Sequence, residues 1–445
     1  MPNLIIFKKK INRFNNTIKV SGDKSISIRW ILFSSIANGV SKAQNLLISE
    51  DVLAALSVIN KLGIKYKLNK TSCRIYGRGL DGYKYKKNLI IDAKNSGTLG
   101  RLILGLLINA TNPIKLVGDK SLSKRDFNRI AKPLSKFGSS FKLRNKINLP
   151  LSINGTANLK PIQYFEKRGS AQCKSAVIFA ALRTKGTTII KAKKSRNHTE
   201  LLCKYLNLPI TVNKKKSYDI IKIRNATKIK SLNYKIPSDI SSSAFFIVLT
   251  ALNVNSKLVI KNVNINPSRI GIIKILKKMG VKIKFKNQKI YKGERNADIQ
   301  IEGPKKLKSI NCPANLTSEA IDEFLVIFLI AAKAEGVSYF KNLAELNQKE
   351  SPRLYWGEKI LNKMGIKTVA TNNSIKIYGN PNLKLYKKIV IKDYLKDHRV
   401  FMTSVIASLS FGGEWHIHDK DSIKTSFPNF LSIIKKIDKL LKKDL

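Results

Sequence analysis

One pattern recurs six times along the sequence, and this repeat limits the possible folds more than any other feature. Each copy has a helix rich in Ala, Leu and Ile, then a turn made by Gly or Asn, then a short apolar strand. The turns, spaced 69–81 residues apart, lie at Asn38-Gly39, Asn112, Gly186, Asn255, Gly336 and Gly412. Such a period indicates one supersecondary unit that buries its apolar face only against its neighbours.

The repeat predicts the secondary structure of each copy. The helices are expected at 27–37, 98–110, 171–182, 241–252, 318–334 and 398–409. The strands that follow them are expected at 41–47, 114–117, 187–191, 257–263, 337–343 and 415–418. A second, shorter helix then ends in a glycine in four copies, at Gly63, Gly138, Gly280 and Gly365. Glycine directly after an apolar-periodic helix is a C-cap signal. With the β-like run that comes next, each copy reads roughly βαβαββ.

The length of the chain and the number of copies predict the domain organisation. A chain of 445 residues is too long for one ordinary core. Six copies in two sets of three predict an α/β protein with two similar lobes. We expect one lobe at 21–236 and a second, discontinuous lobe built from 1–20 and 237–445. Two lobes imply a cleft between them, which is the usual place for a ligand.

The net charge of +56 raises the question of nucleic-acid binding. Lys and Arg are spread over the whole chain, however, and Lys is mixed with Asn and Ile throughout. A nucleic-acid-binding protein more often concentrates these residues on one face or interleaves them with stacking aromatics. We interpret the charge mostly as a Lys bias of the whole proteome. No nucleic-acid partner is expected, and a basic nucleic-acid-binding protein is kept as the alternative from another class.

Other features predict a cytoplasmic protein without a metal site. No run of 18 or more apolar residues is present, so no membrane-spanning helix is expected. The first residues do not have the order of charged and apolar residues of a secretory signal. The four cysteines form no CxxC pair, and with only four histidines no zinc spacing emerges. We expect unpaired thiols at Cys73, Cys173, Cys203 and Cys312.

Basic and small polar residues gather at expected helix starts in the first half. Gly22-Asp23-Lys24-Ser25 enters the first helix, and Arg29 lies about one turn further on. Lys and Ser at a helix N-terminus suit an anion, although a Ser N-cap with solvated bases is the plainer interpretation. Similar segments are Asn95-Ser96-Gly97-Thr98, 118–125 with Arg125, Ser170-Ala171-Gln172 and Ser195-Arg196-Asn197.

The second half adds carboxylates. Asp322 and Glu323 stand in an otherwise apolar predicted helix, where a carboxylate needs a partner or has a raised pKa suited to proton transfer. Lys349-Glu350, Arg353 and Asp397-His398-Arg399 place bases beside acids at predicted helix starts. Several cations with one or two acids suit a substrate that carries phosphate and carboxylate groups.

These motifs, in this order, resemble the EPSP synthase (3-phosphoshikimate 1-carboxyvinyltransferase) family over nearly the whole chain. The resemblance implies a two-lobed enolpyruvyl transferase fold of six βαβαββ repeats, three per lobe, in an inside-out α/β barrel. It implies transfer of the enolpyruvyl group of phosphoenolpyruvate to the 5-hydroxyl of shikimate 3-phosphate by addition and elimination. This step of the shikimate pathway, in aromatic amino-acid biosynthesis, releases phosphate. No metal or organic cofactor is implied, and a monomer is expected.

The resemblance also implies roles for individual residues. Asp322 would take the proton of the 5-hydroxyl, Glu350 would serve proton transfer at the methylene carbon, and Lys24 is a candidate acid. The residues expected at phosphoenolpyruvate are Lys24, Asn95, Gly97, Arg125, Gln172, Arg353 and Arg399. Those expected at shikimate 3-phosphate are Lys24, Ser25, Arg29, Ser170, Ala171, Gln172, Arg196, Asp322 and Lys349. Because Gly97 leaves space beside phosphoenolpyruvate, competitive inhibition by glyphosate is expected.

The sequence departs from the family pattern at a few positions. Pro352 stands where Asp is common, Asp126 where Pro is common, and Thr425 where many members have Lys, so Lys424 is given no role. The nearest alternative is UDP-N-acetylglucosamine enolpyruvyl transferase, which shares the fold. That family usually has a reactive Cys in the loop that matches 118–125, and this chain has none there.

Overall fold

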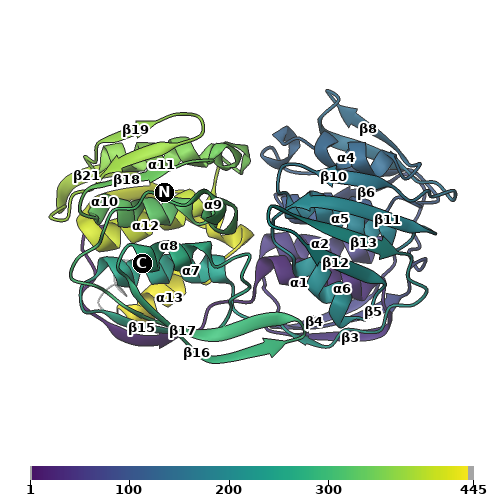
Figure 1. Cartoon of the computed structure of the whole chain (residues 1–445), viewed down its shortest axis with the longest axis horizontal. Helices are drawn as coiled ribbons and strands as arrows, with labels where there is room; N and C mark the ends of the chain where they lie inside the picture. The colour runs from purple at the N-terminus through teal and green to yellow at the C-terminus, as the bar shows by residue number, and fades with distance from the viewer. Residues whose placement is uncertain (1–2, 439–445) are drawn as a thin grey trace. The chain divides into compact units, whose positions relative to one another are not determined.

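The computed structural model describes residues 3–438 and divides the chain into two compact units (Figure 1). The first unit is built from the residues up to Ser21, from Pro237–Ile290 and from the residues after Glu294. The second unit is built from Gly22–Ile236 and Tyr291–Glu294. The sequence did not indicate that the four residues Tyr291–Glu294 leave the first unit. None of the helices in the described part of the chain is long and apolar enough to cross a membrane.

The first helix of each repeat lies in a hydrophobic core. All 13 residues of the seventh helix, Ile240–Leu252, are buried, because the segment is apolar or small on every side. In the first unit these helices lie between the strands within 337–391 and the strands within 257–302 (Figure 1). The helices of this set are α1 (Lys24–Ser35), α3 (Gly97–Leu106), α5 (Ala171–Ala181), α7 (Ile240–Leu252), α9 and α10 (Ala314–Ala320, Phe324–Lys333) and α12 (His398–Phe411).

The second helices end as the sequence predicts. Gly63, Gly138, Gly280 and Gly365 have φ between +84° and +111°, a region that costs glycine little. Asn207 takes the same left-handed conformation in the third repeat, with φ of 54°. The helices of this set are α2 (Glu50–Lys61), α4 (Asn128–Ser135), α6 (His198–Tyr205), α8 (Gly271–Lys278), α11 (Arg353–Lys363) and α13 (Phe430–Ile437), with 3-10 turns η1 (Leu122–Lys124), η2 (Ala344–Gln348) and η3 (Lys420–Thr425).

The strands of the described residues form six sheets, one for each repeat, in the orders β14-β3-β5-β4, β6-β7-β9-β8, β10-β11-β13-β12, β16-β17-β15-β2, β18-β20-β19 and β1-β22-β21. The second sheet shows the βαβαββ repeat in one continuous piece, since β6 and β7 are parallel and β8 and β9 form an antiparallel hairpin. In the second unit the strands are β3 (Asn38–Gln44), β4 (Tyr66–Asn69), β5 (Ser72–Arg78), β6 (Leu89–Asp92), β7 (Ile114–Val117), β8 (Ser140–Arg144), β9 (Asn148–Asn154), β10 (Gln163–Glu166), β11 (Thr187–Lys193), β12 (Ile210–Lys214), β13 (Tyr218–Arg224) and β14 (Tyr234–Lys235).

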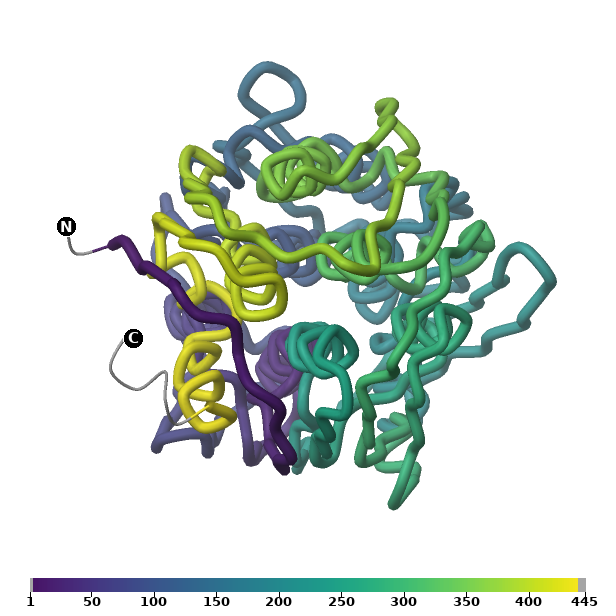
Figure 2. Tube along the Cα trace, turned by 90° about the vertical axis from the view of Figure 1, so that its left-hand side faces the viewer, coloured from purple at the N-terminus to yellow at the C-terminus, as the bar shows by residue number. Residues whose placement is uncertain are grey.

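Three sheets are completed by strands from distant parts of the chain. In the first unit the strands are β1 (Leu4–Phe7), β2 (Asn15–Ile18), β15 (Lys257–Asn264), β16 (Lys282–Tyr291), β17 (Glu294–Glu302), β18 (Val337–Phe340), β19 (Thr368–Ala370), β20 (Ile375–Tyr378), β21 (Leu385–Ile391) and β22 (Gly412–His418). The N-terminal strand β1 pairs with β22, and Figure 2 shows it beside the C-terminal segments. Strand β2 pairs in parallel with β15, and β14 pairs in parallel with β3.

The predicted fifth helix, 318–334, is wrong in one respect. The structure breaks it into α9 and α10, and residues 321–323 form a turn between them. Asp322 therefore does not lie within a helix, and Glu323 occupies the N-cap position of α10. The break has a physical reason, because the backbone carbonyl of Asp322 accepts a hydrogen bond of 2.6 Å from Nη1 of Arg399 instead of a helical one.

The left-handed glycines of the second unit give a stability prediction. A Cβ on Gly63 would lie 2.5 Å from the carbonyl oxygen of Lys84, whereas one on Gly39 would meet no atom within 4 Å. We expect Gly39→Ala to lower the free energy of unfolding by about 1 kcal/mol through φ alone. We expect Gly63→Ala to lower it by about 2–4 kcal/mol, because the backbone must also shift.

The measurement is urea unfolding followed by tryptophan fluorescence. Trp30 is buried in the second unit, so replacing Trp356 and Trp415 by Phe in all variants makes the signal report on that unit. Equal losses for the two alanine variants would contradict the contact with Lys84.

Candidate active site

Three buried helices of the second unit begin at side-chain caps. Asp23 accepts a hydrogen bond from the Ile26 amide at 2.9 Å, so the cap of α1 is Asp23 and not a serine as the plainer interpretation had it. Ser96 and Ser170 cap α3 and α5 in the same way. Such helix starts present backbone N–H groups and the positive end of the helix dipole, which favour anions.

Lys24, the first residue of α1, is held by a carboxylate. Its Nζ lies 2.9 Å from Oδ2 of Asp51, and the two side chains are only 21% and 7% exposed. Lys24 is therefore not a solvated base. The sequence analysis missed Asp51, which stands in the first turn of α2.

Arg29 belongs to the same helix, and its guanidinium is buried. Nε donates to Thr199 Oγ1 at 2.8 Å, Nη2 donates to Ser175 Oγ at 3.2 Å, and Nη1 donates to the Ser25 carbonyl at 3.1 Å. The hydroxyls of Ser175 and Thr199 are themselves 2.7 Å apart. Arg29 therefore joins α1 to α5 and α6, which fixes the direction of its guanidinium.

A second cluster forms around the start of α3. Nη2 of Arg125 donates to Asn95 Oδ1 at 3.3 Å. A Cβ on Gly97 would lie 2.9 Å from Nη1 of Arg125 and 3.1 Å from Nη1 of Arg101, so only glycine fits there without displacing a guanidinium. Arg101 in turn donates to Gln172 Oε1 at 2.6 Å. The sequence analysis missed Arg101, although an arginine inside an apolar helix is an unusual feature.

The start of α5 is fixed by a carboxylate beneath it. Ser170 donates its backbone N–H to Glu166 Oε2 at 2.8 Å, and Ala171 is the first residue of the helix. Burial raises the pKa of Glu166, although backbone N–H groups that include that of Ser170 oppose the shift. Arg196, two residues before α6, is half-buried. The predicted residues of the second unit thus stand at the starts of α1, α3, α5 and α6 and in the loop before α4.

In the first unit, Asp322 is the centre of a network of charged groups. Its Oδ1 lies 3.1 Å from Nζ of Lys349 and 3.6 Å from Nη1 of Arg353. Its backbone carbonyl accepts from Arg399. The break between α9 and α10 therefore exposes both the carboxylate and the carbonyl of one residue to cations.

Arg353 joins Asp322 to two further carboxylates. Its side chain is 2% exposed and contacts Glu350 Oε2 at 2.5 Å and Asp397 Oδ2 at 2.9 Å. Burial lowers the pKa of Arg353, but the charges of Asp397 and Glu350 outweigh burial and raise it above its ordinary value. Burial is the largest influence on the pKa of Asp397 and raises it, but the charge and hydrogen bond of Arg353 together with the charge of His398 bring the pKa below its ordinary value. Both groups are therefore charged inside the protein.

Arg399 has a second buried partner that the sequence analysis did not assign. Its Nη1 lies 4.0 Å from Oε1 of Glu323, which also accepts a hydrogen bond from the Ser241 hydroxyl. Nη2 of Arg269 donates to that hydroxyl at 2.7 Å and lies 3.3 Å from Oδ1 of Asp239, the N-cap of α7. The start of α7 and the break before α10 are thus tied together.

The family departures have local explanations. Pro352 occupies the N-cap position of α11, and Asp126 Oδ1 accepts from the Arg129 amide at 3.2 Å in α4. Lys424 pairs with Asp421 at 3.0 Å, and both side chains are more than half exposed.

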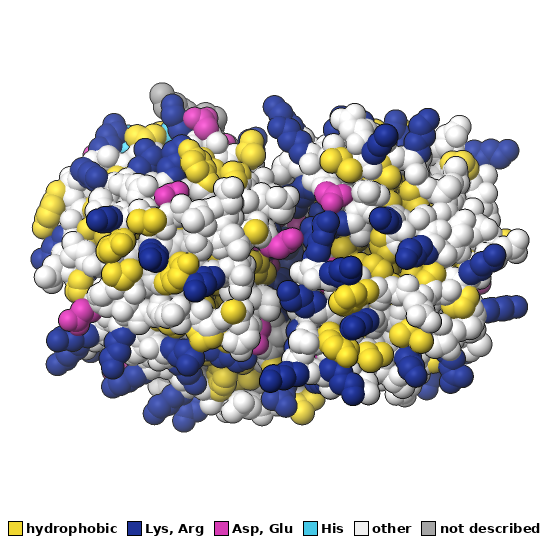
Figure 3. All heavy atoms as spheres, turned by 45° about the horizontal axis from the view of Figure 1, so that its top comes forward, with side chains coloured by type: hydrophobic (Ala, Val, Ile, Leu, Met, Phe, Trp, Pro, Cys, Tyr) yellow, Lys and Arg dark blue, Asp and Glu magenta, His cyan; other side chains and the backbone are white. Residues whose placement is uncertain are grey.

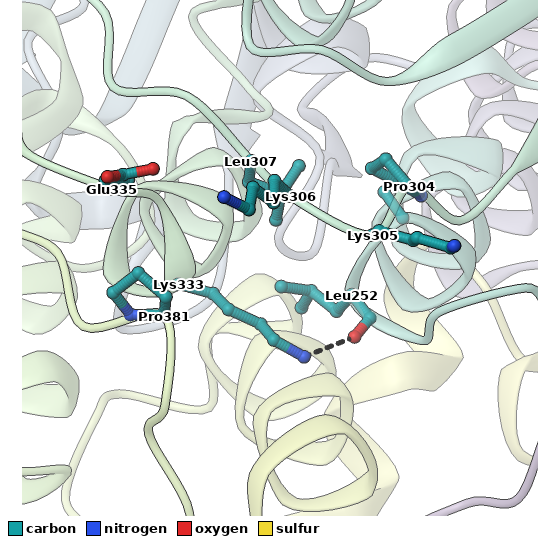
Figure 4. A pocket seen from close by; sticks show the side chains of 9 residues that line it. Leu252, Pro304, Lys305, Lys306, Leu307, Lys333, Glu335 and Pro381 are labelled. Atoms are coloured by element: carbon teal, nitrogen blue, oxygen red, sulfur yellow. Dashed lines mark hydrogen bonds between the residues drawn. The ribbon is translucent and has the colours of Figure 1, made fainter.

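Other potential sites do not involve the predicted residues. A cavity of about 410 Å³ in the first unit has walls from Leu252, Pro304, Leu307 and Lys333 (Figure 4), and none of the predicted site residues lines it. Within residues 3–438 no group of three or more His, Cys, Asp or Glu is arranged to hold a metal ion. The four cysteines are unpaired, as predicted, and all four are buried.

Known proteins are similar to this chain over nearly its whole length. A sequence model described as EPSP synthase (3-phosphoshikimate 1-carboxyvinyltransferase) matches residues 8–434. The chain is also 41% identical to a protein of Ruthia magnifica subsp. Calyptogena magnifica named 3-phosphoshikimate 1-carboxyvinyltransferase, over 96% of this chain and 97% of the relative.

The chain belongs to the EPSP synthase family. An EPSP synthase structure from Acinetobacter baumannii superposes with a TM-score of 0.85 at 35% identity, and 98% of each chain is covered. The enolpyruvyl transferase NikO from Streptomyces tendae, 13% identical, shares the fold with a TM-score of 0.74 over 98% of this chain and 97% of NikO. The predicted fold and the prediction of an EPSP synthase over a UDP-N-acetylglucosamine enolpyruvyl transferase are confirmed.

The buried pair of Arg353 and Asp397 gives a pH-dependent prediction for this EPSP synthase family member. Replacing Asp397 by Asn leaves the guanidinium without its main counter-charge, so the free energy of unfolding at pH 7 should fall by about 3–5 kcal/mol. Because the folded-state pKa of Asp397 is lowered, its stabilisation is fully present above the unfolded pKa of about 4 and is lost as the pH falls through the folded value.

Urea unfolding of both proteins between pH 2 and pH 8 measures the difference. The matched control is Asp421→Asn in the exposed pair with Lys424, which should change stability by less than about 1 kcal/mol at any pH. A difference between wild type and Asp397→Asn that stayed constant down to pH 2 would contradict the assignment.

Proposed function

We propose that this chain transfers the enolpyruvyl group of phosphoenolpyruvate to the 5-hydroxyl of shikimate 3-phosphate and releases phosphate. The observation that carries the proposal is the network in which the carboxylates of Asp322 and Glu350 share the guanidinium of Arg353. Two carboxylates set among cations suit a reaction in which protons are taken from two positions of anionic substrates. Membership of the EPSP synthase family supports the same reaction.

The second unit supplies groups suited to shikimate 3-phosphate. Its phosphate and carboxylate need cations and N–H donors, and the starts of α1 and α5 offer both. Arg29, held by three hydrogen bonds, can present a fixed guanidinium to a carboxylate. We assign to this substrate Lys24, Ser25, Arg29, Ser170, Ala171, Gln172, Arg196, Asp322 and Lys349.

Phosphoenolpyruvate, the smaller substrate, carries its phosphate and carboxylate close together and suits the arginines. Arg125 stands beside Asn95 and the bare backbone of Gly97, and an arginine fork matches the geometry of a phosphate or carboxylate. Arg399 is held by the carbonyl of Asp322 and by Glu323. We assign to phosphoenolpyruvate Lys24, Asn95, Gly97, Arg125, Gln172, Arg353 and Arg399.

The proton transfers follow from these assignments. Asp322 takes the proton from the 5-hydroxyl of shikimate 3-phosphate. The 5-oxygen then forms a bond with C2 of phosphoenolpyruvate, and C3 gains a proton. In the second step the bond from C2 to the phosphate oxygen breaks, and C3 loses a proton to Glu350. Lys24, whose ammonium Asp51 holds at the start of α1, is the proposed acid. It gives a proton to C3 in the addition, regains one from solvent, and gives that proton to the departing phosphate, while Asp322 and Glu350 return their protons to solvent.

Three further proposals concern the environment of the reaction. We propose that the protein is cytoplasmic, that it is a monomer and that it needs no metal or organic cofactor. Gel filtration would test the monomer, and assay in the presence of a chelator would test the need for a metal. Nucleic-acid binding is not proposed, because Lys and Arg side chains are scattered over the face seen in Figure 3 and do not form one stripe.

The reaction itself is tested by phosphate release. Purified protein with phosphoenolpyruvate and shikimate 3-phosphate should release phosphate, whereas either substrate alone should give only background. UDP-N-acetylglucosamine as acceptor should give no release above that background. Release with UDP-N-acetylglucosamine and none with shikimate 3-phosphate would overturn the proposal.

The role of Asp322 is tested by Asp322→Asn, which keeps the shape and removes the proton acceptor. We expect kcat to fall about 10²–10⁴-fold, with the KM for each substrate changed much less. Glu319→Gln is the matched control, because Glu319 lies three residues earlier and pairs with Lys274 at 2.6 Å. Turnover of Asp322→Asn within a few-fold of wild type would remove Asp322 from the role of base.

A further inference from the structure

The hairpin of the fourth repeat differs from those of the other repeats. Its strands β16 and β17 have ten and nine residues, whereas the hairpin strands of the other repeats in the described chain have three to seven. Lys292 and Gly293 form its two-residue turn with φ of 52° and 83°, the backbone typical of a tight type I′ hairpin. The tip, Tyr291–Glu294, belongs to the second unit, although the rest of the hairpin belongs to the first.

Aromatic and backbone contacts hold the tip in the second unit. The Tyr291 hydroxyl accepts a hydrogen bond from the Lys235 amide at 3.0 Å, and its ring meets that of Tyr234 at 5.2 Å. Nζ of Lys292 lies 5.0 Å from the ring centroid of Tyr205, at the end of α6. Several independent contacts thus fix the position of the tip against β14 and α6.

The last residue of the tip makes its most buried contact. Oε1 of Glu294 lies 2.6 Å from Nδ1 of His198, and the two side chains are 1% and 0% exposed. Burying a carboxylate is costly unless a partner satisfies it. His198 is the first residue of α6, so this contact reaches the helix at its N-terminal turn, where a negative charge is also favoured by the helix dipole.

The same turn of α6 carries groups that act on the proposed substrate site. Thr199 accepts the hydrogen bond from Nε of Arg29 at 2.8 Å. Glu200 pairs with Lys174 of α5 at 2.6 Å, and both side chains are at most 4% exposed. Arg196 lies two residues before His198. A rotation or shift of this turn would therefore move Thr199, which holds Arg29, and would move Arg196, which precedes the turn.

We propose that Glu294 is a positioning residue for shikimate 3-phosphate binding, which acts through His198 to fix the first turn of α6. The inference rests on the proposed function, because it assigns Arg29 and Arg196 to that substrate. Glu294 does not contact substrate in this proposal. Glu294 keeps the two arginines oriented before the substrate arrives. Because they are already ordered, binding loses less side-chain entropy.

The test is steady-state kinetics of Glu294→Gln and His198→Gln, which keep side-chain size and weaken the charged contact. We expect the KM for shikimate 3-phosphate to rise about tenfold, the loss typical of one charge-assisted hydrogen bond, while kcat and the KM for phosphoenolpyruvate stay within about threefold. The double variant should be no worse than either single variant, because both remove the same interaction.

Asp298→Asn is the matched control. Asp298 lies on the same strand β17 and pairs with Lys261 at 2.7 Å, within the first unit. It should leave the KM for both substrates unchanged. If Glu294→Gln lowers the melting temperature and leaves the KM for shikimate 3-phosphate at the wild-type value, the residue is only structural and the proposal is wrong. A rise of both KM values by the same factor would also overturn it.

A second measurement separates this inference from the proposed function. Amide hydrogen exchange of residues 198–205 should be faster in Glu294→Gln than in wild type and unchanged in Asp298→Asn. If wild type released no phosphate with shikimate 3-phosphate, the proposed function would fail, and faster exchange would still support the fixing of α6. Equal exchange in all three proteins would overturn the inference whatever the activity.

Discussion

Strand pairing between distant parts of the chain is the constraint on which both units depend. Strand β2 pairs with β15, 242 positions further on, and β14 pairs with β3, 191 positions earlier, in the registers Asn15–Lys257 and Tyr234–Ala43. Each of these strands comes just before the chain leaves its unit, and an Asp-capped helix begins just after it, α1 at Asp23 and α7 at Asp239. The pairings therefore fix the two segments in which the chain leaves one unit for the other. They also fix the helix starts that carry Lys24 and Ser241.

Buried charge is the second constraint, and the proposed substrates account for it. Replacing a buried ion pair by apolar residues of similar size is often neutral or stabilising. The protein nevertheless buries Arg353 with Asp397, and Lys174 with Glu200. These pairs lie beside groups assigned to the substrates, so the desolvation cost is met where fixed charges are useful to the reaction.

Local signals explain what the sequence could predict. The positive φ of Gly63 and Gly138 follows from a short-range preference, because a helix that ends in glycine does so whatever packs around it. The motif residues at the starts of α1, α3 and α5 were found for the same reason. The break at 321–323 could not be found, because the segment is apolar on all sides and the cause is a hydrogen bond from Arg399, 77 positions away. The contact of His198 with Glu294 spans 96 positions and leaves no local trace.

The abundance of lysine also limited the sequence analysis, and the structure shows why the acids are more informative. The chain has 84 Lys and Arg and only 28 Asp and Glu, so a basic residue alone says little about function. Lys24 is distinguished from a solvated lysine by Asp51, and Lys349 by Asp322, and both acids are largely buried. Lys424 has an acid as well, but that pair is exposed. In a chain of this composition, a lysine held by a largely buried carboxylate differs from a solvated lysine, since its charge is fixed in direction before a substrate binds.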